Sequence, residues 1–440
     1  MPERITDHGT EANWAEIVDG EWTSGAVLSG SGSSYIRLIN PHFSNPDGPG
    51  IDILDGAHDI LISGGQGFNC GVTPGGVSGA VTVRNGGVVC NVTVDGFVDD
   101  EGKLHPFEVY NCLGTGLSAE GATDKGLYAS HVTFKNCYVH DIFPRPGEGP
   151  GQETGMGVLF TAVRWGWARK NRVERCALSA VHADAKTQLP NPTEMQCRYM
   201  LFTGNVCGDT FDAPIQLEGA LESAVIGNTL WGLHKDTTLG YRGLIICTAY
   251  AARNTIYGNI LYGKTTGPAI ISDEYSQGTS IDHNTIVCAG KSVSFEDSAA
   301  SVGSSFTNNI YRDAWFGDSP DATFRRANNY RLAGPIDEAN VFVKPAAYDL
   351  RLKPGSPCIG AGEGGSDIGA IPFEEESDVL TIREDVTVTV EKHLKIEQPV
   401  ADGSVQTCET DANGTTLRVL RTYTISDEGE LYEGGVLVEE

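Results

Sequence analysis

The chain has little positive charge and no run of basic residues. Its 440 residues include 31 Lys plus Arg against 58 Asp plus Glu, which gives a formal net charge of −27. Proteins that bind nucleic acid by neutralising phosphates need clustered cations, so no nucleic-acid partner is expected. The acidity favours solubility, as in an extracellular or salty setting. An acidic polymer would bind only through a local basic patch or a bound cation.

Long hydrophobic runs are also missing. The longest mostly apolar stretch, Gly243–Ala252, is far shorter than the roughly 20 residues of a membrane-spanning helix, so no membrane span is expected. The N-terminus begins Met1-Pro-Glu-Arg and has no basic segment followed by an apolar one, so no signal peptide is predicted. A virion protein released by lysis, or a secreted protein whose leader has been removed, would fit this pattern.

Metal-binding cysteine motifs are absent, although cysteine itself is not. The 11 cysteines are odd in number and show no Cys-x-x-Cys or Cys/His zinc spacing. Several lie beside Asn or within apolar runs, such as Cys137, Cys207 and Cys288. We expect most of them to be small buried hydrophobic residues, with disulfides or a reactive thiol as the alternatives.

The chain does contain an internal repeat. An Asn followed by a short apolar strand and a Gly or Asp turn recurs, as in Asn136-Cys-Tyr-Val-His-Asp and Asn205-Val-Cys-Gly-Asp. From Asn205 onward the equivalent Asn residues, at 205, 228, 259, 284 and 309, are 23, 31, 25 and 25 residues apart. Repeats of this length indicate stacked units, and the runs between them alternate with period two, which indicates strands. The 55 glycines follow no three-residue period, so collagen is excluded and many tight turns are favoured.

Each repeat is expected to form one coil of a solenoid. Its bends would use Gly or Asn, because these residues tolerate left-handed backbone angles. Stacked coils lie about 4.8 Å apart, so equivalent side chains form ladders along the axis. The recurring Asn is expected to form such a ladder and to satisfy backbone groups at the turn, a structural role.

The segments Asp349–Gly362 and Asp367–Phe373 resemble the closing segment of bacterial and phage right-handed β-helix proteins. With the Asn repeat, they make residues 51–375 similar to the pectate-lyase-like superfamily, including phage tailspike or fibre proteins and polysaccharide lyases. The resemblance implies an all-β chain with a right-handed parallel β-helix. It does not specify an activity, because members include lyases, hydrolases, epimerases, adhesins and tailspikes.

Three parts of the chain are predicted. Residues 1–50 are expected to cap the first coil, because an open solenoid end exposes strand edges. Residues 51–375 form the β-helix, and the acidic segment 374–378 is a hinge. Residues 379–440 alternate cleanly and predict a small antiparallel β module, either a simple cap or a unit for docking to other virion or surface proteins. Tailspike-like proteins commonly trimerise, so the resemblance implies a homotrimer, although no coiled-coil heptads are present.

The candidate site depends on the register of six strands. Alignment by their alternation pairs the runs Val158–Thr161, Val181–Asp184, Ile215–Glu218, Ile245–Thr248, Ile270–Asp273 and Val293–Glu296. With the first and third residues of each run inside, the last residues form an exposed outward column of Thr161, Asp184, Glu218, Thr248, Asp273 and Glu296. His182 and Gln216 lie beside it. A slip of one residue would turn every side chain over.

In this register Asp184 and Glu218 stand about one coil, roughly 5 Å, apart. That separation suits the nucleophile and the acid/base of a retaining glycosidase, and neighbouring carboxylates raise one another's proton affinity. His182 is the candidate proton carrier. Two alternatives stay open: a merely solvated acidic column, and Ca²⁺ coordination, which needs about six to eight oxygens. No residue is assigned as a metal ligand, and no cofactor other than possible Ca²⁺ is expected.

Candidate substrate-binding residues surround the column: Gln216, Trp165, Trp231, Tyr250, Arg164 and Arg242. Flat rings can stack on sugars, although many aromatic side chains pack under loops or in the core. No pattern in the chain matches a known lyase or polygalacturonase-like site. The resulting hypothesis is a virion- or surface-associated β-helix that recognises bacterial surface polysaccharide, with or without cleaving it. The alternatives are a secreted polysaccharide lyase or glycoside hydrolase, and a purely structural assembly protein.

Overall fold

The computed structural model describes most of the chain up to residue 373 and, beyond it, the course of six strands. The residues outside the described part are 1–2, 6–8, 31–32, 55, 72–78, 85–88, 123–125, 146, 149–153, 186–194, 233–242, 264, 266, 274, 297–298, 317–319, 374–378, 387–393, 400–404, 411–416, 426–430, 434–435 and 438–440. The described residues divide into two compact units, Met1–Phe373 and Glu374–Glu440.

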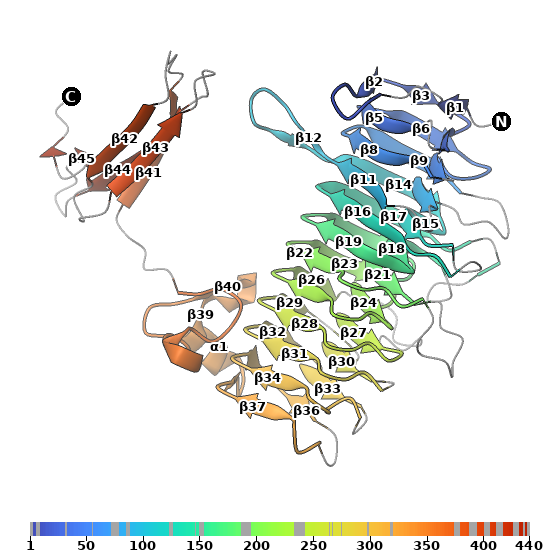
Figure 1. Ribbon diagram of the computed structural model, residues 1–440. Coiled ribbons are helices and arrows are strands. Elements are labelled where there is room, and N and C mark those ends of the chain that lie inside the picture. Colours follow the sequence, from blue (N-terminus) through green and yellow to red (C-terminus); the bar gives the residue numbers. More distant parts are fainter. Residues whose placement is uncertain are drawn as a thin grey trace. The chain divides into compact units, whose positions relative to one another are not determined.

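Three parallel sheets of 12 strands each form the first unit (Figure 1). Sheet 1 runs in spatial order through β1 (Glu3–Ile5), β4 (Ala26–Ser29), β7 (Ile51–Leu54), β10 (Val81–Arg84), β15 (Thr115–Glu120), β18 (Met156–Thr161), β21 (Val181–Asp184), β24 (Ile215–Glu218), β27 (Ile245–Thr248), β30 (Ile270–Ser272), β33 (Val293–Phe295) and β36 (Ala314–Trp315). Sheet 2 runs through β2 (Ala15–Val18), β5 (Ser34–Ile39), β8 (His58–Ser63), β11 (Val89–Asp95), β16 (Ala129–Lys135), β19 (Val163–Arg169), β22 (Leu201–Thr203), β25 (Ala224–Ile226), β28 (Thr255–Tyr257), β31 (Ser280–Asp282), β34 (Ser305–Thr307) and β37 (Arg325–Ala327). Sheet 3 runs through β3 (Glu21–Trp22), β6 (His42–Asn45), β9 (Gln66–Cys70), β14 (Phe107–Leu113), β17 (Cys137–Phe143), β20 (Arg172–Cys176), β23 (Val206–Thr210), β26 (Thr229–Gly232), β29 (Ile260–Gly263), β32 (Thr285–Cys288), β35 (Ile310–Tyr311) and β38 (Tyr330–Arg331).

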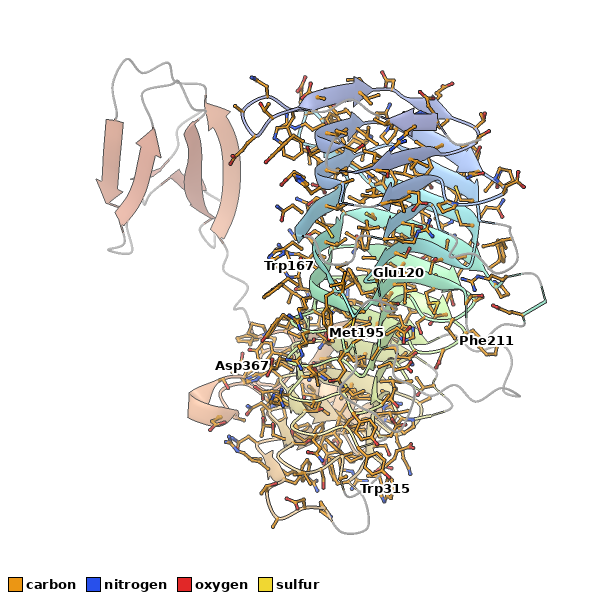
Figure 2. All side chains as sticks on the ribbon, turned by 45° about the vertical axis from the view of Figure 1, so that its right-hand side comes forward. Glu120, Trp167, Met195, Phe211, Trp315 and Asp367 are labelled. Carbon is orange, nitrogen blue, oxygen red and sulfur yellow. The ribbon has the colours of Figure 1, made fainter. Side chains whose placement is uncertain are left out.

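Every coil contributes one strand to each sheet in turn, so neighbouring strands of a sheet come from successive coils. This architecture is the right-handed parallel β-helix predicted from the repeat. Its side chains are packed along the whole solenoid, down to Trp315 in the last coil (Figure 2).

The core lies inside the three sheets because alternate residues of each strand point inward. In β5, for example, Ser34, Ile36 and Leu38 are buried and the residues between them are half-buried. The inward side chains form one cluster that extends from the first coil to the last. Like residues stack within it, as with Phe134 and Phe160, whose ring centroids lie 5.4 Å apart. Period-two alternation in the sequence therefore translates directly into the core.

The Asn ladder is confirmed, and it is buried. The Oδ1 atom of Asn205 accepts hydrogen bonds from the backbone N–H and the Nδ2 of Asn171, each at 3.0 Å. The same pattern continues through Asn171, Asn205, Asn228, Asn259, Asn284, Asn309 and Asn329. Asn136 is not a member, because Cys137 takes the equivalent place and donates its N–H to Asn171. The ladder satisfies backbone groups at the bend between sheets 2 and 3, as expected for a structural role.

The ten described cysteines are all buried, and none forms a disulfide with another described cysteine. Burial raises the pKa of the Cys90 thiol to about 11 and that of the Cys247 thiol to about 12, since a buried thiolate is poorly solvated. These values keep the thiols protonated at neutral pH. The prediction that most cysteines act as small hydrophobic residues is confirmed.

Residues 1–50 do not form a separate cap. They supply the first two strands of each sheet, β1 to β6, and the register of β1 against β4 is the same parallel pairing found later in the solenoid. Runs such as Ala26–Ser29 bury alternate residues and so join the core directly. The prediction of a cap was wrong because the alternation of these short strands is hidden by the Gly/Ser-rich turns between them.

The end of the first unit folds back onto the outer face of sheet 3. It contains α1 (Pro335–Val341), the antiparallel pair β39 (Phe342–Lys344) and β40 (Asp349–Leu352), and two 3₁₀ turns, η2 (Pro345–Ala347) and η3 (Glu363–Gly365). Its apolar side chains pack against Val287 and Ile310 on the outer face of sheet 3. Together they form a second cluster of buried residues: Val287, Ile310, Leu332, Val341, Phe342, Leu350, Leu352, Cys358 and Ile368. The closing segment therefore covers sheet 3 in its last coils and leaves sheet 1 to other contacts.

Two smaller antiparallel elements complete the description. A hairpin of β12 (Phe97–Val98) and β13 (Leu104–His105) projects between sheets 2 and 3. The second unit contains a four-stranded antiparallel sheet and a two-stranded one, built from β41 (Val379–Val386), β44 (Leu417–Ile425), β45 (Leu431–Glu433) and β46 (Val436–Leu437), and from β42 (Leu394–Pro399) and β43 (Val405–Thr410). None of the helices in the described part is long and apolar enough to cross a membrane.

Candidate functional site

The predicted register of the candidate strands is confirmed. In sheet 1, Thr161 of β18 lies opposite Asp184 of β21, and Glu218 of β24 lies opposite Thr248 of β27. His182 lies opposite Gln216. The first and third residues of these strands are in the core, so the second and fourth point outward.

The row formed by the second residues points outward but is buried. Its members are at most 9% exposed: Leu159, His182, Gln216, Ile246, Ile271 and Ser294. Two small clusters account for the apolar members, because Met156 and Leu178 pack on Leu159 while Ala213 packs with Ile246 and Ile271. The expectation of an open sheet face was therefore wrong for this row. A buried outer row can place polar groups away from bulk water.

In the row formed by the fourth residues, the carboxylates are partly exposed and the threonines are buried. Thr161 and Thr248 are each 3% exposed, whereas Asp184 and Glu218 are half-buried. The Glu218 side chain keeps 34% of its surface. The other two acids of the predicted column are also in contact with solvent, because Asp273 is half-buried and Glu296 is exposed. A merely solvated acidic column therefore stays an alternative.

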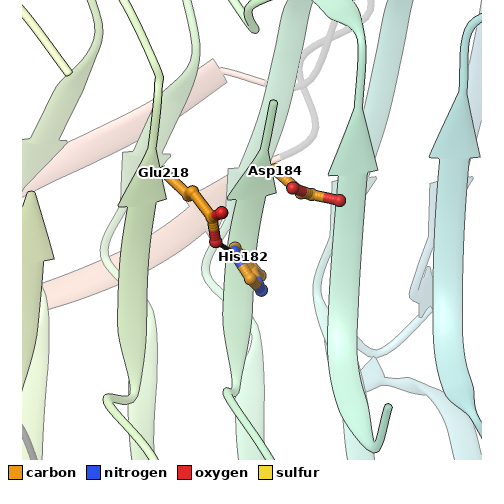
Figure 3. Close-up of side chains that lie close together, drawn as sticks. All are labelled: His182, Asp184 and Glu218. Atoms are coloured by element: carbon orange, nitrogen blue, oxygen red, sulfur yellow. Dashed lines mark ion pairs between the residues drawn. The ribbon is translucent and has the colours of Figure 1, made fainter. Parts of the chain in front are cut away.

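His182, Asp184 and Glu218 lie close together here, with Glu218 directed towards His182 (Figure 3). One ligand atom from each of the three side chains lies within 4.8 Å of the other two. His182 Nε2 lies 3.3 Å from Glu218 Oε2, across the gap between β21 and β24. Among the residues that the structure describes, this is the one cluster of three His, Cys, Asp or Glu side chains with such spacing.

Neutral polar side chains extend the cluster. Gln216 Nε2 donates to Glu218 Oε2 at 3.3 Å, and Ser179 Oγ donates to Gln216 Oε1 at 3.2 Å. Thr161 Oγ1 donates to Asp184 Oδ2 at 3.4 Å. Each carboxylate thus has a donor that fixes its orientation. The sequence contained a signal for Thr161, which lies in the predicted column, but none for Ser179, which precedes its strand.

The histidine carries the unusual electrostatics of the site. Burial of the ring lowers the pKa of His182, but Glu218, Asp184 and Asp212 favour the charged form more strongly, so its pKa lies above the ordinary value. His182 is only 4% exposed, and neither ring nitrogen has a hydrogen-bond partner among the described residues. The contact to Glu218 is an ion pair without hydrogen-bond geometry. Buried polar atoms in this condition require an explanation.

The predicted sugar-binding residues are only partly brought together. Gln216 belongs to the cluster. Tyr250 follows β27 in the turn after Thr248 and stacks on Tyr275, with ring centroids 5.1 Å apart. Tyr250 follows β27 and Tyr275 follows β30, both strands of sheet 1.

Trp165 and Arg164 lie at the start of β19 in sheet 2 and have partners there. The Trp165 ring stacks between His131 and Tyr199, at centroid distances of 4.9 Å and 5.4 Å. Its two faces are therefore occupied, and only its edge is presented to solvent. The Arg164 guanidinium lies 4.0 Å from the centroid of the Tyr128 ring. These contacts build the outer corner between sheets 1 and 2.

Two further candidates lie elsewhere. Trp231 is on β26 of sheet 3, where its indole packs against Gly208 so closely that no larger side chain would fit. It belongs to a different face from Asp184 and Glu218. Arg242 lies outside the described residues. The sequence placed these residues near the column only because they follow it along the chain.

Sheet 3 carries its own cluster of ionisable side chains. Glu174 is 4% exposed and accepts hydrogen bonds from Tyr138 at 2.7 Å and from Arg172 at 2.9 Å, while Arg175 forms a further ion pair. Arg175, opposed by partial burial and assisted by His140, lowers the pKa of Asp141 to about 2. These carboxylates are ion-paired to arginines, an arrangement typical of a stabilising network.

No protein-family model matches the chain, and no curated protein matches it. Solved structures do. The Streptococcus pneumoniae surface protein and adhesin PfbA matches with a TM-score of 0.50 at 13% identity, over 72% of this chain and 89% of that one. Pectate lyase Pel9A matches with a TM-score of 0.45 at 14% identity, over 80% and 89%. The enzymatically active domain of bacteriophage CBA120 tailspike protein 2 matches with a TM-score of 0.41 at 12% identity, over 95% and 65%. At such identities the likeness concerns the fold, which is the parallel β-helix.

Proposed function

We propose that this chain is a virion- or surface-associated β-helix protein that binds bacterial surface polysaccharide at the outer face of sheet 1. The observation that carries the proposal is the convergence of His182, Asp184, Glu218 and Gln216 on one face, with the carboxylates open to solvent. A few convergent polar groups beside a buried apolar surface are typical of ligand sites. Carboxylate and amide groups offer the acceptors and donors that sugar hydroxyls need.

The charge of the site favours a neutral or amino-sugar polymer. The net charge of the chain is −27, and the raised pKa of His182 indicates a negative local potential. Like charges on protein and ligand oppose association, so a polyanion would bind weakly unless a cation lies between them. The first ligands to test are therefore uncharged capsular polysaccharides and O-antigen chains.

Cleavage of the bound polysaccharide is a second candidate function, favoured by the spacing of the carboxylates. The ligand oxygens of Asp184 and Glu218 lie within 4.8 Å. Carboxyl groups about 5 to 5.5 Å apart are typical of retaining glycosidases, whereas inverting enzymes need roughly 6.5 to 9.5 Å. The sheet register fixes this separation, so the pair would hydrolyse with retention of configuration.

The environments of the two carboxylates assign their roles. Glu218, whose Oε2 lies 3.3 Å from His182 Nε2, would in its protonated form donate that proton to the glycosidic oxygen as the bond to the anomeric carbon breaks. Asp184, oriented by Thr161, would form the bond to the anomeric carbon. Water would then replace Asp184 at that carbon and give its proton to Glu218. Glu218 thus gives one proton in the first step and regains one in the second, and Asp184 forms and then loses one bond to the anomeric carbon.

The test is a panel of purified bacterial capsules and lipopolysaccharides. Binding is measured by affinity electrophoresis, hydrolysis by new reducing ends, and lyase activity by absorbance at about 235 nm, where unsaturated uronates absorb. Asp184→Asn and Glu218→Gln should weaken binding about tenfold and lower any cleavage rate by about 100-fold or more, because each removes a charged contact or a proton-transfer group.

Glu222→Gln is the matched control. Glu222 lies four residues after Glu218, its side chain has the same 34% exposure, and it is ion-paired to Arg253 instead of belonging to the cluster. The control variant should behave as the wild-type protein. Binding that is unchanged in both site variants, or the absence of any bound polysaccharide, would remove the proposal. Binding without cleavage would leave recognition as the function.

The homotrimer and the docking role of residues 379–440 stay predictions, as does the virion or extracellular location. Light scattering on the full chain measures the oligomeric state directly. Deletion of residues 374–440 tests the second unit, because a docking module would be dispensable for polysaccharide binding at sheet 1 and required for assembly with its partner.

A further inference from the structure

We infer that His182, Asp184 and Glu218 form a binding site for a divalent metal ion of the zinc class. The inference concerns the same cluster as the proposed function, but it can be tested without any polysaccharide. It rests on the geometry of three ligand atoms and on the condition of the buried histidine, which are independent observations.

The geometry fits a small, tetrahedrally coordinated ion. Metal–ligand distances of about 2.0 to 2.2 Å place two ligand atoms of a tetrahedral site about 3.4 Å apart. The measured distance between His182 Nε2 and Glu218 Oε2 is 3.3 Å. The ligand atom of Asp184 lies within 4.8 Å of both, which makes it the candidate for the third position. Three protein ligands and one position open to water are typical of reactive zinc sites.

The histidine supplies the second observation. His182 is 4% exposed, and both ring nitrogens lack a hydrogen-bond partner among the described residues. A buried imidazole normally donates or accepts at one nitrogen at least. Its Nε2 points at a carboxylate, an arrangement that a proton or a metal ion would complete. The side chain is therefore aimed into the cluster, with Nε2 in an ion-pair contact to Glu218 and no hydrogen bond at either ring nitrogen.

The ligand set also selects the ion. Imidazole nitrogen suits zinc and neighbouring transition metals, whereas Ca²⁺ takes about six to eight oxygens and Mg²⁺ prefers an octahedron of oxygens. The cluster offers two carboxylates and one nitrogen, which is too few oxygens for Ca²⁺. The Ca²⁺ considered from the sequence is thus a weaker fit than Zn²⁺. The 34% exposure of the Glu218 side chain leaves access for the ion and a water.

Metal binding and the proposed hydrolysis compete for the same atoms. A carboxylate bound to an ion cannot also attack a sugar carbon or carry a catalytic proton. Zn²⁺ should therefore inhibit any cleavage reversibly, and a chelator should restore it. If Zn²⁺ is instead required for cleavage, the metal site stands and the carboxylate mechanism of the proposed function is overturned.

The experiment uses the full chain, freed of metal by dialysis against a chelator and titrated calorimetrically with ZnCl₂, MnCl₂ and CaCl₂. We expect one Zn²⁺ per chain, bound at least about tenfold more tightly than Ca²⁺ because of the nitrogen ligand. His182→Gln, Asp184→Asn and Glu218→Gln should each weaken Zn²⁺ binding at least about tenfold, since even loss of an outer-shell partner costs 10- to 100-fold. Zinc affinity should also fall as the pH is lowered, because protons compete with the ion for the imidazole and carboxylate ligands.

Glu222→Gln again serves as the control and should bind Zn²⁺ as the wild-type protein does. Circular dichroism of each metal-free variant verifies folding. If His182→Gln does not fold, Asp184→Asn and Glu218→Gln test the inference. These two variants should fold, because the side chains that they change are half-buried. Wild-type protein without saturable Zn²⁺ binding, variants with unchanged affinity, or tighter binding of Ca²⁺ than of Zn²⁺ would each overturn the inference.

Discussion

The outer faces of sheets 1 and 3 both hold buried ionisable side chains, but the partners of these side chains differ. On sheet 3, Glu174 is enclosed by Tyr138, Arg172 and Arg175. On sheet 1, His182 faces Glu218 with both ring nitrogens lacking a hydrogen-bond partner in the described part of the chain. The arginines satisfy the Glu174 carboxylate with hydrogen bonds, whereas the buried ring of His182 has an ion-pair contact and no hydrogen bond.

The pKa shifts express the same difference. Arg175 lowers the pKa of Asp141 on sheet 3 to about 2, so that carboxylate stays charged across the physiological range. The acidic neighbours of His182 raise its pKa above the ordinary value despite burial. We therefore assign the completed ion pairs of sheet 3 to stability, and the proposed function to the outer face of sheet 1.

Removal of the Glu174 charge should have the largest effect on stability. Glu174→Gln removes the carboxylate that Arg172 and Arg175 share, and loss of a hydrogen bond to a charged group costs about 2 kcal/mol. Glu218→Gln should lower the free energy of unfolding by less than about 1 kcal/mol, because its side chain is half-exposed to water. Urea unfolding followed by circular dichroism compares the two. Equal losses would erase the distinction between the faces.

Acid should weaken sheet 3 through Asp141, with a smaller effect. Its folded pKa of about 2 lies below the ordinary value of 3.8, so its contribution to stability is present above pH 3.8 and is lost as the pH falls towards 2. Asp141→Asn should remove about 1 kcal/mol at neutral pH, a value reduced for screening because 39% of the side chain is exposed. The difference between the wild-type and variant unfolding free energies should shrink as the pH falls from 4 to 2. A difference that does not change with pH would contradict this account.

The sequence predicted what depends on local alternation. The period-two runs predict the inward residues. The spacing of Asn205, Asn228 and Asn259 predicts the ladder that their hydrogen bonds form. The register that pairs Thr161 with Asp184 followed from the same alternation. The alternation recurs from coil to coil, so a single sequence shows the same pattern many times.

Contacts between distant segments could not be predicted in this way. Nothing local in the sequence indicates that Met156 and Leu178 cover Leu159, or that the closing segment returns to Ile310 on sheet 3. Trp231 was grouped with the carboxylates because the bends between strands could not be placed, and it lies on another sheet. The sequence therefore predicts which residues of sheet 1 share an outward row. It does not predict how deeply they are buried, because that depends on side chains packing from outside the coil.

The most direct measurement is a crystal structure of the protein with an oligosaccharide from the polysaccharide that it binds, using Glu218→Gln to prevent turnover. The account predicts a sugar on the outer face of sheet 1, within hydrogen-bond distance of Asp184 and beside Tyr250. A sugar bound instead on sheet 3, near Trp231 and Glu174, would contradict the central claim that the two faces are divided between function and stability.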